Sequence, residues 1–273
     1  MNLPSFSTLT LALDQGIAEV RLNRPDKSNA MNDAMWQEIR QAFEWVDATP
    51  EARVAILAGN GKNFCAGIDL AMLASIQQHI ADPEAARSRE KLRRLILDLQ
   101  DCLTAIERCR KPVLAAIHGA CVGGALDVVT CCDMRYATAD AIFSIKEIDL
   151  AMVADVGTLQ RLPRLIGEGM ARELAYTGRN VGAAEAAAIG LINRVFDTPE
   201  ALQAAVREIA TAIAAKSPLA TRGIKEVMNY SRDHSVADGL NFVATWNAGL
   251  LLSGDLQESI AAMQERRAPR FPD

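Results

Sequence analysis

Short β-rich runs alternate with helical stretches along most of the chain, and this alternation limits the fold more than any other feature. Between the runs AEVRLN and VAILAG lies the helical stretch AMNDAMWQEIRQAFEWVDA, whose expected N-cap is Asn32 or Asp33. Alternation of this kind predicts an α/β core with right-handed crossovers. The runs lie between about Leu9 and Val195 and read LTLAL, AEVRLN, VAILAG, VLAAIHG and MRYATADAIFSI.

From about Thr198 onward the sequence is helical in period and offers no strand candidate. Pro218, Asp233 and Gly254 predict the joints between these helices. We therefore predict an α/β core over residues 1–197 and a C-terminal helical region over 198–273. The segment LNFVATWNAGLL is too apolar for a solvated helix face, so we expect it either to pack on the core or to contact another subunit.

The charge balance argues against two classes of partner. The 273 residues include 29 Lys+Arg and 34 Asp+Glu, a net charge of −5, which disfavours a general nucleic-acid surface and an anionic membrane surface. No apolar run approaches the roughly 18 residues of a membrane span. The N-terminal letters lack a secretory pattern and the C-terminal RRAPRFPD lacks a peroxisomal SKL-type ending, so the predicted location is cytoplasmic.

The cysteines predict reduced, mostly buried thiols rather than a metal site. No pair of them has CxxC spacing and no histidine pattern lies near them, so we expect no zinc and no resident cofactor. The six are Cys65, Cys102, Cys109, Cys121, Cys131 and Cys132.

Two segments place glycines where a strand ends: AGNGKNFCAGIDL (58–70) and HGACVGGALDVVTCCD (118–133). Glycine permits a sharp turn, and the first turn of a following helix has unpaired N–H groups. Each segment alone could be an ordinary strand-to-helix turn. If the two turns face each other, their amides could bind one carbonyl oxygen and stabilise negative charge on it. GGALD does not match GxGxxG, so a dinucleotide site has little support.

Three acids in apolar surroundings are candidates for proton transfer, because desolvation raises the pKa of a carboxyl group toward neutrality. Asp127 follows the second glycine turn, Glu147 is expected at the end of a strand AIFSIKE, and Asp155 lies in AMVADVGT. Structural roles are the alternatives. Asp155 could cap a helix, Asp127 could face a helix dipole, and Glu147 could be a solvated strand end.

In order and spacing, the blocks FCAGIDL, HGACVGGALDVVTCCD and GTLQRLPRLIG resemble the enoyl-CoA hydratase/isomerase (crotonase) superfamily. The similarity extends from RLNRPDKSNAMN to the helical tail. It implies a crotonase-like ββα spiral core, followed by C-terminal helices that form a homotrimer or a hexamer of two trimers. It also implies that the backbone N–H groups of Ile68 and Gly124 bind the thioester oxygen of an acyl-CoA substrate.

Within that superfamily, hydratases usually have glutamate at the position of Asp127 and glycine at that of Asp155. The trio Asp127, Glu147 and Asp155 instead resembles the Δ3,5-Δ2,4-dienoyl-CoA isomerases, which act in fatty acid β-oxidation. The resemblance implies that Glu147 and Asp155 act as base and acid, with Asp127 as an auxiliary buried acid. The alternatives are an enoyl-CoA hydratase, an isomerase that moves one double bond, and a non-catalytic CoA- or RNA-binding protein of the same fold.

A protein with net charge −5 needs a local basic cluster to bind the phosphates of coenzyme A. The resemblance places Arg24, Lys27 and Ala30 near the adenine and phosphates, and Ala66 and Ile68 beside the pantetheine. Any of these cations could instead be a solvated surface residue. Weaker candidates are Lys62, Arg266 and Arg267, and His118 is expected to pack against its glycine turn rather than to act as a base.

Overall fold

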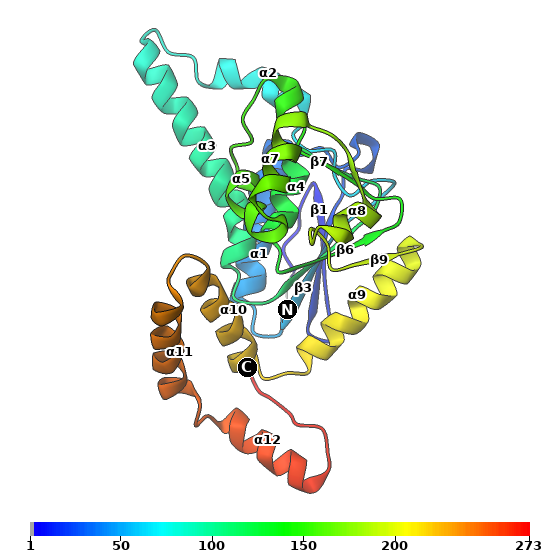
Figure 1. Cartoon of the computed structure of the whole chain (residues 1–273), viewed down its shortest axis with the longest axis vertical. Coiled ribbons are helices and arrows are strands. Elements are labelled where there is room, and N and C mark those ends of the chain that lie inside the picture. The colour runs from blue at the N-terminus through cyan, green and yellow to red at the C-terminus, as the bar shows by residue number, and fades with distance from the viewer. Residues whose placement is uncertain (1–2) are drawn as a thin grey trace.

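The computed structural model describes residues 3–273, so the first two residues of the predicted core region lie outside the described part (Figure 1). Its larger sheet has six strands in the order β1-β2-β3-β4-β6-β9. β1 pairs antiparallel with β2, and every other neighbouring pair is parallel. These strands span Leu9–Asp14 (β1), Ile17–Leu22 (β2), Val54–Gly59 (β3), Val113–Ile117 (β4), Met134–Thr138 (β6) and Arg194–Phe196 (β9).

The burial of each strand follows from its place in this sheet. Every residue of β3 and β4 is buried, because these strands lie inside the sheet with layers on both faces. β1 lies at the edge, and alternate residues of its LTLALD sequence are more exposed. The predicted strands VAILAG and LTLAL are both present, the first inside the sheet and the second at its edge.

A second sheet has three strands in the order β5-β7-β8, which span Ala120–Val122, Ile142–Ser144 and Val181–Gly182. The run MRYATADAIFSI therefore forms two strands in different sheets. A turn separates them, in which Ala141 N donates to Thr138 O at 3.0 Å. The strand expected to end at Glu147 ends at Ser144, and Glu147 begins a 3-10 helix, η2 (Glu147–Leu150).

The predicted helix after the second strand is confirmed, with Asn32 as its N-cap accepting from Met35 N. The predicted joints are also confirmed: α10 begins at Pro218, Asp233 follows its end, and α12 begins at Gly254. The first half of the chain contains η1 (Pro25–Lys27), α1 (Asp33–Ala48), α2 (Leu70–His79), α3 (Ala85–Arg108) and α4 (Gly124–Thr130). The second half contains α5 (Thr158–Arg161), α6 (Pro163–Ile166), α7 (Glu168–Thr177), α8 (Ala183–Ala188), α9 (Pro199–Ala214), α10 (Pro218–Arg232), α11 (Val236–Leu250) and α12 (Gly254–Glu265).

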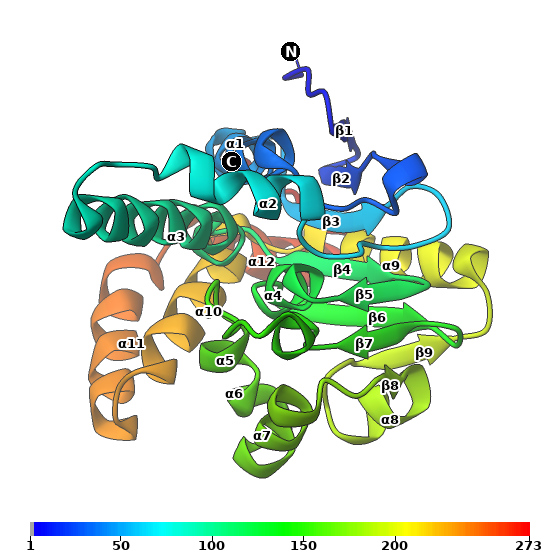
Figure 2. The same ribbon diagram turned by 90° about the horizontal axis from the view of Figure 1, so that it is seen from above.

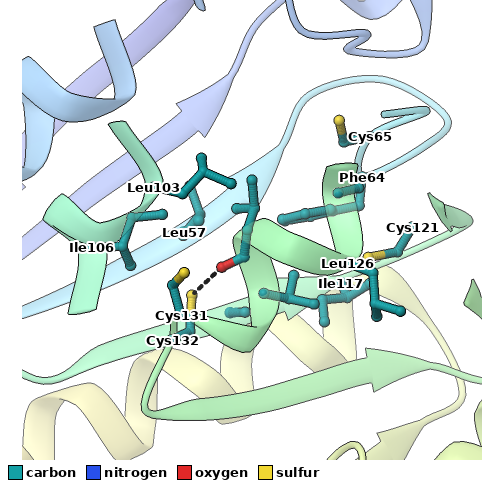
Figure 3. Packing of buried hydrophobic residues seen from close by; sticks show 14 of the residues in the cluster. Leu57, Phe64, Cys65, Leu103, Ile106, Ile117, Cys121, Leu126, Cys131 and Cys132 are labelled. Carbon is teal, nitrogen blue, oxygen red and sulfur yellow. Dashed lines mark hydrogen bonds between the residues drawn. The ribbon is translucent and has the colours of Figure 1, made fainter. Parts of the chain in front are cut away.

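Two apolar clusters lie on opposite faces of the larger sheet. On one face, α9 packs Leu202, Val206 and Ala210 against the strands. On the other, the large cluster joins the sheets to α1, α3 and α4. Figure 3 shows part of this cluster around α4, with side chains from both sheets and from α3. The six cysteines are free and buried. The helix that carries the second glycine turn is thus enclosed by the core.

Helices α11 and α12 lie away from the sheets in Figure 1, and α11 lies to one side of them in Figure 2, whereas α10 contacts the core through Lys225, which pairs with Asp133 at 2.7 Å. Apolar side chains of α11 and of the joint that follows it are exposed in the single chain: Val236 at 80%, Leu240 at 64% and Leu252 at 86%. Residues 199–214 instead lie on the sheet as α9, and the division at residue 198 stays a prediction. In residues 3–273 no helix is both long enough and apolar enough to cross a bilayer.

Candidate active site

The two glycine turns lie against each other. The backbones of Cys65 and Cys121 pair in an isolated parallel β-bridge between the segments, and Val122 N donates to Cys65 O at 3.2 Å. A Cβ atom placed on Gly67 would lie 2.7 Å from Val122 O and 3.2 Å from Gly124 N. Gly67 also has a φ of +88°, a conformation that favours glycine. Glycine is therefore required here both by the turn and by the close approach of the second segment.

This contact brings together the two amides that the resemblance indicated. A Cβ atom on Gly124 would lie 3.8 Å from Ile68 N. Gly124 is the first residue of α4, so its N–H has no partner within the helix. In the described residues 3–273, neither amide donates to another protein group. Two such free donors on adjacent turns could bind one oxygen and stabilise negative charge there.

Asp127 and Glu147 lie next to these turns. Asp127 is in the first turn of α4 and is fully buried. Its Oδ1 accepts the Thr158 backbone N–H at 2.5 Å, whereas its Oδ2 has no hydrogen-bond partner in the described chain. Glu147 is half-buried, and a Cβ atom on Gly123 would lie 3.4 Å from its Oε1. The Glu147 carboxylate therefore faces the glycine turn that precedes α4.

Asp155 lies in the loop between η2 and α5, and its side chain is exposed in the single chain. It does not cap α5, because the N-cap is Gly157 and the Thr158 amide binds Asp127. Its backbone carbonyl accepts a hydrogen bond from Gln100 Nε2 at 2.6 Å. The exposed setting of Asp155 differs from the apolar surroundings that the sequence predicted, although its neighbours Ala154 and Val156 are buried.

The three carboxyl groups have raised pKa values. Burial, with a smaller contribution from the charge of Glu147, raises the pKa of Asp127 to about 7, and the hydrogen bonding by Thr158 opposes this rise. Burial also raises the pKa of Glu147, and the charge of Asp155 adds to the effect. Partial desolvation raises the pKa of Asp155. Because burial raises the pKa of each of the three acids, the site can exchange protons closer to neutrality than solvated carboxyl groups can.

The residues expected to contact coenzyme A surround the first glycine turn, but Arg24 has other partners. Its guanidinium pairs with Asp69 at 2.9 Å and donates to the Ala30 carbonyl. The positive charge of Arg24 is therefore already paired with the carboxylate of Asp69. Lys27 is exposed at the end of η1, and Ala66 is exposed beside half-buried Ile68.

The weaker candidates are placed differently. Lys62 is exposed on the first glycine segment. Arg267 pairs with Glu258 at 2.5 Å, and it follows α12, which lies remote from the turns in the single chain (Figure 1). Arg266 is the exposed C-cap of α12. His118 Nε2 lies 2.9 Å from Gly61 O, so this histidine packs against its loop as predicted. In the described part of the chain, no three His, Cys, Asp or Glu residues are grouped to hold a metal ion.

The contacts that hold the Asp155 loop were missed by sequence reasoning. Thr158 and Gln100 each bind a residue more than 30 positions away, Asp127 at a separation of 31 and Asp155 at a separation of 55. No local pattern marks either residue. Only the packing of α3, α4 and α5 brings them together.

Comparisons with known proteins agree over nearly the whole chain. A family model described as enoyl-CoA hydratase/isomerase matches residues 12–273. The peroxisomal Delta(3,5)-Delta(2,4)-dienoyl-CoA isomerase of Arabidopsis thaliana is 47% identical over 99% of each chain. The mitochondrial enzyme of that name from Mus musculus is 45% identical over 92% of this chain and 77% of its own. A crystal structure of enoyl-CoA hydratase from Bacillus anthracis aligns with a TM-score of 0.88 at 30% identity, over 97% of this chain and 99% of that one.

The predicted cytoplasmic location is wrong by this comparison. The similar isomerases of Arabidopsis thaliana and Mus musculus are named peroxisomal and mitochondrial, and neither is named cytoplasmic. The prediction depended on missing targeting patterns, and the absence of a recognisable pattern does not locate a protein.

Proposed function

The chain belongs to the enoyl-CoA hydratase/isomerase family and has the crotonase fold predicted from its sequence, and from this premise we propose that it converts 3,5-dienoyl-CoA to 2,4-dienoyl-CoA. The relatives named as isomerases of this type support the proposal. Such a reaction belongs to the β-oxidation of unsaturated fatty acids.

The reaction needs two separated proton transfers. A proton leaves C2, next to the thioester carbonyl, and the electron pair moves through the diene as both double bonds shift by one position. A proton is then added at C6. One carboxyl group cannot easily reach both carbons, so two acids along the extended acyl chain suit this reaction better than one.

The intermediate is a dienolate with negative charge on the thioester oxygen. We assign the N–H groups of Ile68 and Gly124 to bind that oxygen. Donors that are already oriented stabilise the charge without reorganisation, and one such donor contributes roughly 3 to 4 kcal/mol in comparable sites.

The observation that supports the proposal is that Asp127 and Glu147 lie beside the glycine turn that carries the Gly124 amide, while burial and the charge of Asp155 raise the pKa of both. We assign Glu147 and Asp155 to the two proton transfers. Asp127 is an auxiliary acid, and its charge raises the pKa of neighbouring groups when it ionises.

The acyl-CoA is the substrate, and we propose no resident cofactor. Lys27, Ala30, Ala66 and Ile68 lie along the loop and turn where the coenzyme is expected, and the exposed Lys27 ammonium is available to a phosphate. Arg24 then acts mainly by joining Asp69 to the Ala30 carbonyl.

We further propose that the chain forms a homotrimer or a hexamer of two trimers. The exposed apolar side chains of α11 support this, because Val236 and Leu240 are uncovered in the single chain. Sedimentation of the purified protein measures the subunit number directly, and a monomer at micromolar concentration would contradict the proposal.

The test of function is a comparison of two substrates. Purified protein is incubated with a 3,5-dienoyl-CoA and separately with a 2-enoyl-CoA. Rising absorbance of the conjugated dienoyl thioester in the first reaction supports the isomerase. Loss of enoyl absorbance in the second, without the first, would identify a hydratase. No change in either would favour a non-catalytic CoA-binding protein.

A further inference from the structure

The position of Asp155 depends on how its loop is held. The side chain is exposed and the residue lies outside any helix or strand. On its C-terminal side the loop is attached to α4, because Thr158 N donates to Asp127 Oδ1 at 2.5 Å. Asp155 itself is attached to α3, because Gln100 Nε2 donates to its carbonyl oxygen at 2.6 Å.

The contact from α3 belongs to a series along one helix face. Gln100, Thr104 and Glu107 are spaced so that they lie on the same side of the helix. Arg161 Nη2 of α5 donates to Thr104 Oγ1 at 3.3 Å and to Glu107 Oε2 at 2.7 Å. One polar stripe of α3 therefore contacts the segment from Asp155 to Arg161. Gln100, Thr104, Glu107 and Arg161 also line a cavity of about 1050 Å³.

This stripe comes from the firmly packed half of α3. Leu99, Cys102, Leu103 and Ile106 are buried against the core, whereas the first turns of the helix are mostly exposed. The packing of this half of α3 against the core therefore holds the backbone of Gln100 in place. Gln100 is itself half-buried, which limits the freedom of its amide.

We propose that Gln100 is a positioning residue for Asp155. Its amide fixes the backbone of Asp155, and through it the distance between the Asp155 carboxylate and the carbon that exchanges a proton. This inference depends on the proposed isomerase function and adds a residue to it that does not touch the substrate. Displacement of a reacting group by about 1 Å can cost up to roughly 100-fold in rate.

The direct test is Gln100→Met, which keeps the length of the side chain and removes the donor. We expect kcat on a 3,5-dienoyl-CoA to fall by about 10-fold or more while KM stays within about twofold, because binding of the coenzyme and thioester is not affected. Gln100→Glu removes the donor in a different way and is expected to give the same pattern. It keeps the test usable if the methionine variant folds poorly.

A control separates positioning from general packing. Gln37 of α1 also donates its side-chain amide to a neighbouring helix, to Asp98 Oδ2 at 2.8 Å, but it has no contact with the Asp155 loop. We expect Gln37→Met to keep wild-type kcat. Equal losses of kcat in both variants would show that loss of packing, not the contact with Asp155, causes the effect and would overturn the proposal.

The decisive measurement is a double-mutant cycle. In an Asp155→Asn background, Gln100→Met is expected to cause no further loss of kcat, because no acid remains to be positioned. A full additional loss in that background, or unchanged kcat in the single variant, overturns the inference. Wild-type protein without activity on 3,5-dienoyl-CoA would instead contradict the proposed function, so the two failures can be told apart.

Discussion

The two halves of the candidate site are built in different ways. The glycine turns with the Ile68 and Gly124 amides are joined to each other by backbone contacts, and Gly67 lies too close to Val122 O to accept a side chain. One buried side chain, Asn29, adds hydrogen bonds to carbonyl oxygens of the first segment. The loop with Asp155 is held mainly by side chains, Gln100 and Asp127, that belong to other helices.

The difference suggests how one fold can serve several reactions. Backbone amides do not depend on which charged side chains surround them, so the proposed pair of donors is a property of the fold. The acids depend on individual side chains and their contacts, so they can change without loss of the amide pair.

Asp155→Asn is expected to lower kcat by about 1000-fold, since positioned acids and bases contribute roughly 100- to 10,000-fold. Affinity for a non-reacting acyl-CoA, measured by calorimetry, should stay within about twofold because the amides are intact. Asp149→Asn is the matched control, as Asp149 is an exposed acid that pairs with Lys146. Wild-type turnover by Asp155→Asn would contradict the assigned role.

Asp127 should make stability depend on pH. Its pKa is raised from 3.8 to about 7, so between these values the folded state keeps a proton that the unfolded state has lost. The free energy of unfolding therefore falls as pH rises through this range, by up to about 4 kcal/mol, and levels off above it. Asp127→Asn removes this contribution, and its amide oxygen can still accept the Thr158 N–H.

Urea unfolding at one fixed protein concentration, at several pH values between 4 and 8, checks this expectation. The difference in stability between Asp127→Asn and wild type should grow with pH in favour of the variant. A difference that stays constant across the range would show that Asp127 does not keep its proton in the folded protein.

The sequence was most informative where neighbouring residues determine the local structure. VAILAG predicted a strand and GACVGG a glycine turn, and both are present because β-rich runs and positive-φ turns are local properties. The run MRYATADAIFSI was not separated into two sheets, since the pairing partner of β7 is β5 and that pairing is not local.

The same distinction applies to the site. The three acids could be selected from motifs, but the exposure of Asp155 and its contact with Gln100 follow from how α3 packs. The pairing of Arg24 with Asp69, 45 residues apart, could not be predicted from the sequence either. Partners that are distant in sequence need the assembled fold.

Gly67→Ala should damage the backbone-held half of the site. A Cβ atom there would lie 2.7 Å from Val122 O at a φ of +88°, so the turn must shift. We expect a loss of about 1 to 3 kcal/mol in stability and roughly a 10- to 100-fold loss in kcat. Gly169→Ala is the control, because nothing lies near its Cβ position on α7 and alanine is the better helix former. Full activity in Gly67→Ala would refute the assignment of this turn.

The smallest effect is expected at the surface cation next to the turns. Lys27 is exposed, so its ammonium should add only about 0.2 to 1 kcal/mol to the binding of a phosphate, and Lys27→Ala should raise KM by about 1.4-fold to fivefold without changing kcat. Because salt screens exposed charges, the difference should nearly disappear at about 0.5 M salt. Lys216→Ala, at an exposed lysine after α9, should leave KM unchanged. A fall in kcat for Lys27→Ala would mean that this loop also sets the geometry of the amide pair, and the contrast between backbone-held and side-chain-held parts would then have to be redrawn.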